Sequence, residues 1–304
     1  MSGISNFKFK PMNKIYIFSL LIFVFLFSQS CQTIIDIDQK EFQKRLVMSC
    51  TLNPDSIINV YVTRSVGPLA SGLPLTITDA IVDFYEDGNL LFTIPHDSAG
   101  NYSYNFHPVI GKTYTVKAAA PGFEQSIEAT TIIPTSAIID TFSYAIVLNE
   151  ENNWGSQYGL NGSITINDLP GENYYMIQAY QSSVDTFNSP TQINGYNLYI
   201  TADDPLIGNS RDYNSSILFS DFSFDGTSYK INFSSDNVDT YSFDVHLQYI
   251  VYSLSKESYL YLISLNNYYK SNGNPFAEPV QVYSNVSSGM GILGSASRWE
   301  ALVY

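Results

Sequence analysis

The chain has 304 residues, with 28 acidic and 14 basic side chains and a formal net charge of −14. A chain this acidic repels nucleic acid and anionic lipid headgroups, which excludes binding to either through a basic surface. With 24 tyrosines, 19 phenylalanines and only 14% charged residues, its composition also excludes a disordered tail.

The first segment is typical of an export signal, whether translation starts at Met1 or at Met12. The apolar stretch from Ile15 to Phe27, 13 residues long, follows Lys14 directly. A helix that crosses a bilayer needs about 20 apolar residues, whereas the apolar part of a secretory signal is shorter. We therefore predict that residues 1–30 form a cleaved signal peptide.

Cys31 follows this apolar run after two small serines. The sequence FSQSC, residues 27–31, resembles a bacterial lipobox, although it lacks the usual leucine three positions before the cysteine. Ordinary signal peptidase would accept the same small residues. In a lipoprotein the cysteine becomes the new N-terminus and carries acyl chains, which anchor the chain to a membrane without crossing it. We predict lipidation at Cys31, with residues 31–39 as a tether.

The second cysteine, Cys50, alternates in step with the apolar residues Leu46, Met48 and Leu52, so that all four would lie on one face of a strand. This pattern predicts a buried thiol that packs as a small hydrophobic side chain and does not act as a nucleophile. No disulfide is available once Cys31 is lipidated.

Alternation of apolar and polar residues dominates the next hundred residues and predicts short β-strands. Pairs such as Asp87-Gly88 and Pro121-Gly122 mark turns between them. The expected strands lie at 58–63, 80–85, 101–106, 114–118 and 127–133. The spacing predicts an antiparallel, Ig-like β-sandwich domain over residues 40–135.

Three segments of this domain resemble a transthyretin-like or carboxypeptidase-regulatory module. They are AIVDFYEDGN (80–89), AGNYSYNF (99–106) and GKTYTVKAAAPGF (111–123). The resemblance implies a binding or spacer unit and is a signal of fold alone.

Residues 136–304 form the expected second domain, which is β-rich and contains one helix. The stretch 135–153 is expected to hold a linker, and alternation then resumes at 162–166, 175–179, 196–200, 229–233 and 241–251. A helix is predicted at 254–271, capped by Ser255 and ended by Gly273 and Pro275. The predicted fold class is therefore mostly β, with two antiparallel sandwich-like domains.

No set of residues in the sequence nominates a catalytic centre. There is no phosphate-binding loop, no metal-spaced histidine set and no nucleophile elbow. Asp221-Phe-Ser-Phe-Asp225-Gly226 has two acids and a glycine, but it lacks the alternating third ligand and the closing glutamate of a calcium loop. We favour a strand that runs into a turn there, and expect neither a metal nor a cofactor.

The segment NPFAEPV, residues 274–280, carries the most specific resemblance, together with YSNV at 283–286 and GMGI at 289–292. Weaker matches are CQTIIDID (31–38), DAIVDFY (79–85), NYY (173–175) and SDFSFDG (220–226). Together these motifs resemble the DUF4249 lipoprotein family over essentially the whole mature chain. One mild departure is Leu293, where the family often has phenylalanine.

The resemblance implies an outer-membrane lipoprotein of Gram-negative bacteria, frequently encoded beside a TonB-dependent receptor and without an established activity. We therefore expect a non-catalytic accessory or ligand-capture partner of such a receptor in nutrient uptake, on the periplasmic or the surface face of the membrane. The alternatives are an envelope enzyme that acts on glycan or peptide, and an architectural spacer. The small ligand is left unspecified.

Within the motif, Pro275 and Pro279 stiffen a loop, while Gly289, Gly291 and Gly294 permit close backbone approach or a positive φ. This favours a structural closing segment of the second domain. The alternative is a contact surface for a partner. Its candidate residues are Asn274, Pro275, Phe276, Glu278 and Pro279.

Two short patterns, Asp55-Ser56-Ile57 and Asp97-Ser98-Ala99, look like sites that some bacteria of this kind O-glycosylate in the periplasm. Ser56 and Ser98 are therefore candidate modification sites.

Overall fold

The structure is a computed structural model that describes residue 18 and residues 42–67, 74–152, 155–185, 192–202, 204, 206–207, 215–238, 245–272, 274 and 276–302. Cys31 and the predicted tether lie outside these residues. Residues 43–304 form one compact unit, separate from residues 1–42. The fold below is that of the second unit.

Strands account for most of the described chain, as the alternation predicts. The first nine are β1 (Leu46–Leu52), β2 (Ile58–Arg64), β3 (Leu75–Thr76), β4 (Ile81–Glu86), β5 (Asn89–Ile94), β6 (His96–Ser98), β7 (Asn101–Tyr104), β8 (Thr113–Ala119) and β9 (Ile127–Ile132). The others are β10 (Ile138–Asn152), β11 (Gly155–Asn167), β12 (Tyr174–Asp185), β13 (Gln192–Leu198), β14 (Ile200–Ala202), β15 (Ile217–Ser220), β16 (Ser228–Val238), β17 (His246–Leu254) and β18 (Met290–Leu302). The helix α2 spans Lys256–Ser271.

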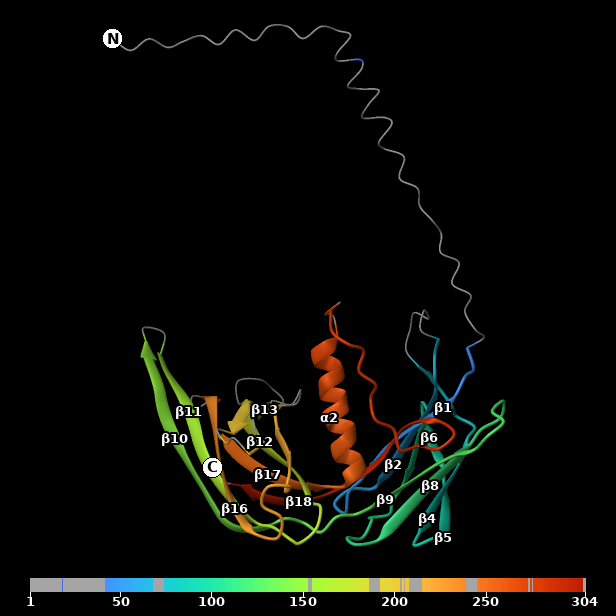
Figure 1. The fold of residues 1–304 in the computed structure, drawn as a ribbon, viewed down its shortest axis with the longest axis horizontal. Coiled ribbons are helices and arrows are strands. Elements are labelled where there is room, and N and C mark those ends of the chain that lie inside the picture. The colour runs from blue at the N-terminus through green and yellow to red at the C-terminus, as the bar shows by residue number, and fades with distance from the viewer. Residues whose placement is uncertain are drawn as a thin grey trace. The chain divides into compact units, whose positions relative to one another are not determined.

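These strands form three sheets (Figure 1). The largest has ten strands, eight of them in the order β13-β12-β17-β18-β1-β2-β7-β6, with β15 beside β12 and β3 beside β2. Two four-stranded sheets have the orders β5-β4-β8-β9 and β10-β11-β16-β14. The mostly β, antiparallel prediction is confirmed, although β1 and β18 pair in parallel.

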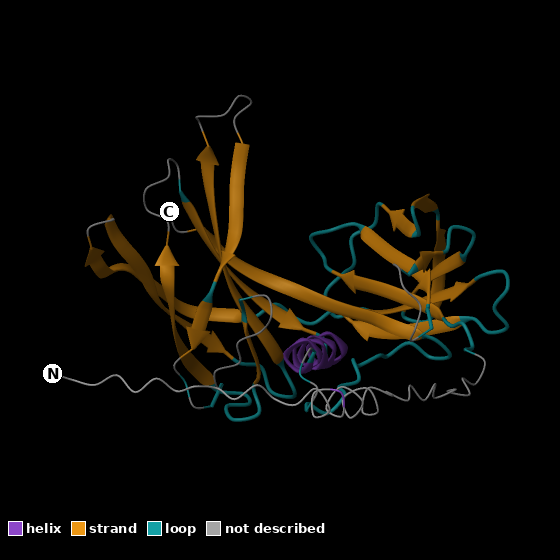
Figure 2. Cartoon of the chain, turned by 90° about the horizontal axis from the view of Figure 1, so that it is seen from above, coloured by secondary structure: helices purple, strands orange, loops and turns teal. Residues whose placement is uncertain are grey.

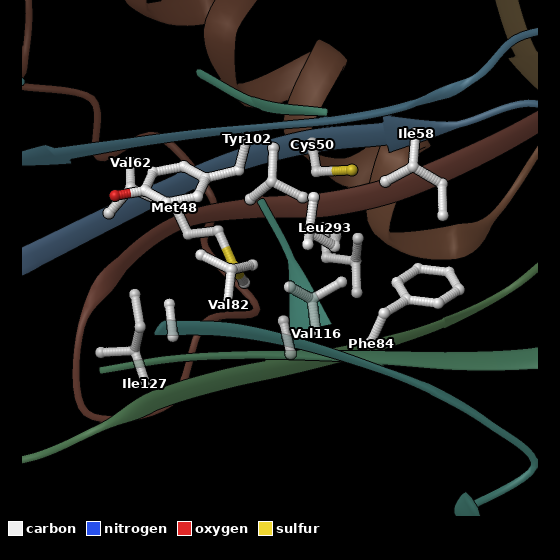
Figure 3. Close-up of a cluster of buried hydrophobic side chains, with 14 of the residues drawn as sticks. Met48, Cys50, Ile58, Val62, Val82, Phe84, Tyr102, Val116, Ile127 and Leu293 are labelled. Carbon is white, nitrogen blue, oxygen red and sulfur yellow. The ribbon is translucent and has the colours of Figure 1, made fainter. Parts of the chain in front are cut away.

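The first core lies between the β1-β2-β7 part of the large sheet and the sheet β5-β4-β8-β9. Figure 3 shows Met48, Cys50 and Val62 from the large sheet packed toward Val82 and Val116 of the small one. Every second side chain of β1 is buried, because the pleat of a strand points alternate residues to one face. Val286 and Leu293, from the C-terminal part of the chain, belong to this same core.

The second core lies between β12, β13 and β17 of the large sheet and the sheet β10-β11-β16-β14. Its fully buried members include Ile164, Ile177 and Tyr249. A third, smaller cluster, formed around Leu254, packs under Tyr259 and Leu262 of α2. Figure 2 looks along the axis of this helix and shows it among the strands.

The helix begins and ends close to where the sequence predicts. Ser255 is its N-cap, and the Ser258 backbone N–H donates to the Ser255 hydroxyl at 3.2 Å. Such a bond satisfies one of the backbone donors that the first turn of a helix leaves free. The helix ends at Ser271, while the predicted stop signals Gly273 and Pro275 lie outside the described residues.

One segment differs from its prediction. The stretch 135–153 was expected to hold a linker, but most of it is β10, the 15-residue edge strand of its sheet. The residues of β10 that pack on the second core, Ile139, Phe142 and Ile146, are only partly buried and are three and four residues apart. Register shifts after Ile139 and Leu148 also interrupt the strand, so the segment shows no clear period of two. The predicted strand 241–251 is described only from residue 245, and within that part it forms the start of β17.

Candidate functional site

Cys50 has the buried, structural role that its pattern predicts. Its side chain is 3% exposed, and loss of water around the thiol raises its pKa to about 12. Burial and a raised pKa both make this thiol unreactive at neutral pH, because the thiolate is the nucleophilic form.

Three carboxylates meet where two turns of the chain lie side by side. One ligand oxygen each from Asp168, Asp221 and Asp225 lies within 4.8 Å of the others. Asp168 follows β11, and the other two belong to the turn after β15. The sequence analysis considered Asp221 and Asp225 but missed Asp168, because it lies 53 residues before Asp221 and joins them only through the fold.

Hydrogen bonds within the protein already occupy these carboxylates. Asp168 accepts from the Tyr175 hydroxyl at 2.6 Å and from the Gly226 N–H at 2.8 Å. Asp221 accepts from the Asn173 N–H at 2.9 Å. Burial raises the pKa of Asp221, the bonds from Asn173 lower it, and the neighbouring carboxylates add to the rise. The segment 220–226 is the end of a strand that runs into a turn, as the sequence predicts, and the cluster braces this turn against the one after β11. We assign no ion to it.

A cavity of about 460 Å³ lies beside the first turn of α2. Its walls come from β8, β9, the start of β12, the end of β17 and the start of α2. Its lining includes two carboxylates and one ammonium group, namely Glu172, Glu257 and Lys256. No sequence motif pointed to this place, because its residues come from five separate elements.

An ion pair closes one side of the cavity. Lys256 Nζ lies 2.8 Å from Glu172 Oε2, which also accepts the Tyr174 hydroxyl at 3.0 Å. The hydrogen bond from Lys256, and then that from Tyr174, lowers the pKa of Glu172. The Tyr174 ring stacks on Tyr259 of α2, with 4.5 Å between the ring centroids.

A chain of hydroxyl groups joins α2, β18 and β9 beside the cavity. Ser258 Oγ donates to the Ser295 carbonyl at 3.0 Å, and the Ser295 N–H donates back to Ser258 Oγ at 2.8 Å. Ser295 Oγ in turn donates to the Ile132 carbonyl at 2.6 Å and lies 3.0 Å from Thr131 Oγ1. The three elements are therefore held together by buried polar contacts as well as by apolar packing.

The glycines predicted to permit close approach do so. A Cβ on Gly289 would lie 2.8 Å from the Leu46 carbonyl oxygen, and one on Gly294 would overlap the Ser258 hydroxyl. Gly291 has φ of +117°, and a Cβ there would overlap the carbonyl of Met48. The motif lets β18 lie against β1 and α2, which gives it a structural role.

The segment proposed as a contact surface is exposed. Phe276 is 95% exposed, and its N–H donates to Asn274 Oδ1 at 3.1 Å, so a local turn presents the ring. Glu278 and Pro279 are also exposed, whereas Pro275 lies outside the described residues. None of these residues lines the cavity at α2.

The residues that follow fix this segment to the body of the protein. The Tyr283 N–H donates to Ser264 Oγ on α2 at 2.8 Å. The Ser287 N–H donates to the Glu128 carbonyl at 2.8 Å, which covers part of the outer edge of β9. The chain is thus fixed to the body of the protein at Tyr283 and Ser287, which follow Phe276 by seven and eleven residues.

The remaining candidates are scattered. Ser56 is exposed in the turn after β1, and Ser98 is exposed at the end of β6. Cys31 lies outside the described residues. Within the part of the chain that the structure describes, no helix is long and apolar enough to span a membrane.

Comparison with known proteins identifies the family of the chain. A family model described as "Domain of unknown function (DUF4249)" matches residues 32–300. No curated protein matches the chain. Six chains of solved structures do.

One of these solved structures is described as "Structural basis for the promiscuous specificity of the carbohydrate-binding modules from the beta-sandwich super family". It shares 10% sequence identity with this chain, with a TM-score of 0.20, and the match covers 71% of this chain and 97% of that chain. A TM-score this low carries no argument about fold or ligand.

Proposed function

Because that family model spans most of its length, the chain belongs to the DUF4249 family, and from this premise we propose that it is a non-catalytic outer-membrane lipoprotein that assists a TonB-dependent receptor in nutrient uptake. Lipid chains on Cys31 would hold it at the membrane. The receptor would contact the segment 274–279, on either face of the membrane.

The exposure of Phe276 carries this proposal. A fully exposed phenylalanine leaves a large apolar ring in water, and such rings are common anchors in protein interfaces. The turn at Asn274 and the bonds at Tyr283 and Ser287 hold its segment in place. An anchor held in this way loses little conformational entropy when a partner binds.

The test is a pull-down of tagged, lipidated protein from outer membranes in mild detergent, with partners identified by mass spectrometry. We expect a TonB-dependent receptor in near-equal amount, and loss of most of it with Phe276→Ala. Phe222→Ala is the matched control, because Phe222 is 91% exposed and lies elsewhere in the sequence. Cys31→Ala tests the need for the lipid anchor.

Each alternative function predicts a different result. Equal recovery with Phe276→Ala and Phe222→Ala would remove segment 274–279 from the interface. Failure to recover any receptor would contradict the accessory role. Turnover of a glycan or peptide by the purified protein would then favour an envelope enzyme, and neither binding nor turnover would favour an architectural spacer.

A further inference from the structure

Three exposed apolar side chains lie at the end of the large sheet where β1 begins. They are Val66, which follows β2, Leu75 of β3 and Met290, the first residue of β18, and each is between 38% and 50% exposed. The pairing of the strands places them together, because Leu75 pairs with Arg64 at the end of β2 and Met290 pairs with Val47 of β1. Apolar side chains that cluster at a surface mark an interaction site more often than scattered ones do.

Three cations accompany these apolar side chains. Lys44 and Arg45 come directly before β1 and are exposed, and Arg64 ends β2. The Arg45 N–H donates to Ser65 Oγ at 2.9 Å and the Ser65 N–H donates to the Arg45 carbonyl at 2.8 Å, so the start of β1 is fixed to the end of β2. Within the part of the chain that the structure describes, none of the three cations forms an ion pair. Their charges are available to an anionic group outside the protein.

The chain enters its compact unit at this same end of the sheet. Gln43, the first residue of that unit, lies 12 residues after Cys31, the predicted point of lipid attachment. A chain of that length spans at most about 40 Å when fully extended. A lipid anchor would therefore keep the start of β1 close to the bilayer. We call this surface the tether end, and it consists of Lys44, Arg45, Arg64, Val66, Leu75 and Met290.

A bilayer surface matches both kinds of side chain at the tether end. Apolar side chains enter the boundary between headgroups and acyl chains, while lysine and arginine extend their charged groups to the lipid phosphates. The protein as a whole has a net charge of −14 and is repelled by anionic lipid. The surface that suits it is therefore zwitterionic, with phosphates that are balanced by amines.

We propose that the tether end is the surface with which the body of the protein lies on the zwitterionic face of a membrane. Its apolar side chains enter the bilayer interface, and its cations contact lipid phosphates. The inference rests on the lipid anchor of the proposed function and not on the receptor, since no residue of the tether end belongs to the segment 274–279.

The test measures how close single tryptophans come to lipid. The lipidated protein is inserted into phosphatidylcholine vesicles in which some acyl chains carry bromine, a quencher of nearby tryptophans. We expect bromine to quench the added fluorescence of Leu75→Trp at least threefold more strongly than that of Leu90→Trp. Leu90 is the matched control, because it is 55% exposed and lies on β5, outside the tether end. The wild type gives the background of Trp154 and Trp299.

The outcomes separate this surface from the anchor. Equal quenching at the two positions, or none in Leu75→Trp, would overturn the proposal. Mass spectrometry of the N-terminal peptide of the same sample shows whether Cys31 carries acyl chains. An acylated Cys31 with unquenched Leu75→Trp would remove the tether end from the membrane and leave the anchor intact, whereas an unacylated Cys31 would overturn both.

Further variants, made in the Leu75→Trp protein, test the two kinds of contact. Met290→Asp places a carboxylate in the apolar contact and should lower the quenching about fivefold, with the thermal midpoint nearly unchanged because the side chain is exposed. Arg45→Gln should lower the quenching about twofold. Lys230→Gln removes an exposed cation of β16 and should have no effect. Undiminished quenching in both Met290→Asp and Arg45→Gln would place the membrane contact elsewhere and overturn the proposal.

Discussion

Asn285 and Leu293 bind each other as two strand residues would, although Asn285 lies in a loop. The Leu293 N–H donates to Asn285 Oδ1 at 3.0 Å, and Asn285 Nδ2 donates to the Leu293 carbonyl at 2.9 Å. Asn285 Nδ2 also lies 3.4 Å from the Thr130 carbonyl of β9. One side chain therefore connects β18 to the edge of the neighbouring sheet.

Asn285→Ala should lower the free energy of unfolding by about 1–3 kcal/mol, because it leaves backbone groups of a half-buried strand without partners. Urea unfolding measures the change. Asn285→Asp keeps the acceptor for the Leu293 N–H but places a carboxylate oxygen against the carbonyl oxygens of Leu293 and Thr130, so it should destabilise the protein as well. If Asn285→Ala were as stable as the wild type, water would be replacing the hydrogen bonds between Asn285 and Leu293.

Gly291→Ala should cost at least about 2 kcal/mol, because a side chain there has an unfavourable φ and also overlaps the Met48 carbonyl. Gly111→Ala is the matched control, since Gly111 has φ of +80° but no atom within 4 Å of an added Cβ. Thermal and urea unfolding of both variants separate the two effects. A Gly291→Ala protein no less stable than Gly111→Ala would show that β18 does not lie against β1 as described.

Alkaline pH should destabilise the protein through Cys50. Burial raises the folded pKa of this thiol from 9.0 to about 12, so the unfolded chain loses the proton first as pH rises. The stability linked to the thiol is complete below pH 9 and falls between pH 9 and 12. At pH 11 the loss should be about 3 kcal/mol.

The comparison protein for this effect is Cys50→Ala, because tyrosines also ionise in this range. The difference in unfolding free energy between the wild type and the variant should shrink from pH 8 to pH 11. A constant difference would mean that the thiol is not desolvated. The same burial predicts that a thiol reagent labels Cys50 only after denaturant is added.

Calcium should leave the thermal midpoint of the protein unchanged, because the oxygens of Asp168 and Asp221 already accept hydrogen bonds from the turns that they brace. Differential scanning calorimetry with millimolar calcium and with chelator measures this. A midpoint that rises by several degrees in the wild type, but not in Asp221→Asn, would contradict the turn-bracing role.

The strands and the helix cap that depend on local sequence pattern could be predicted from the sequence. The alternation in β2, β8 and β9 and the cap at Ser255 follow from burial of one strand face and from helix-end chemistry, which short windows contain. The role of the glycines near residue 290 was predicted as well, since close approach and positive φ are the two common uses of glycine. The division of the mature chain at residue 135 stays a prediction.

What the sequence could not show is which distant segments meet. The sequence predicts a linker in place of β10 because the residues of β10 that pack on the core are irregularly spaced and show no period of two. The cavity joins Thr131 to Glu172 and Glu257, and the acidic cluster joins Asp168 to Asp221, through contacts that no sequence spacing encodes. Lipidation at Cys31 and modification at Ser56 and Ser98 also stay predictions.

The parallel pairing of β1 with β18 has a consequence for how the protein is made. Val47 of β1 leaves the ribosome 243 residues before its pairing partner Met290 of β18, and Leu293 of the same core follows later still. The first core therefore cannot be completed until β18 has emerged, and until then one edge of β1 stays unpaired. A nascent chain in this state needs protection from aggregation, and a truncation before β18 would leave both halves of the protein unfinished.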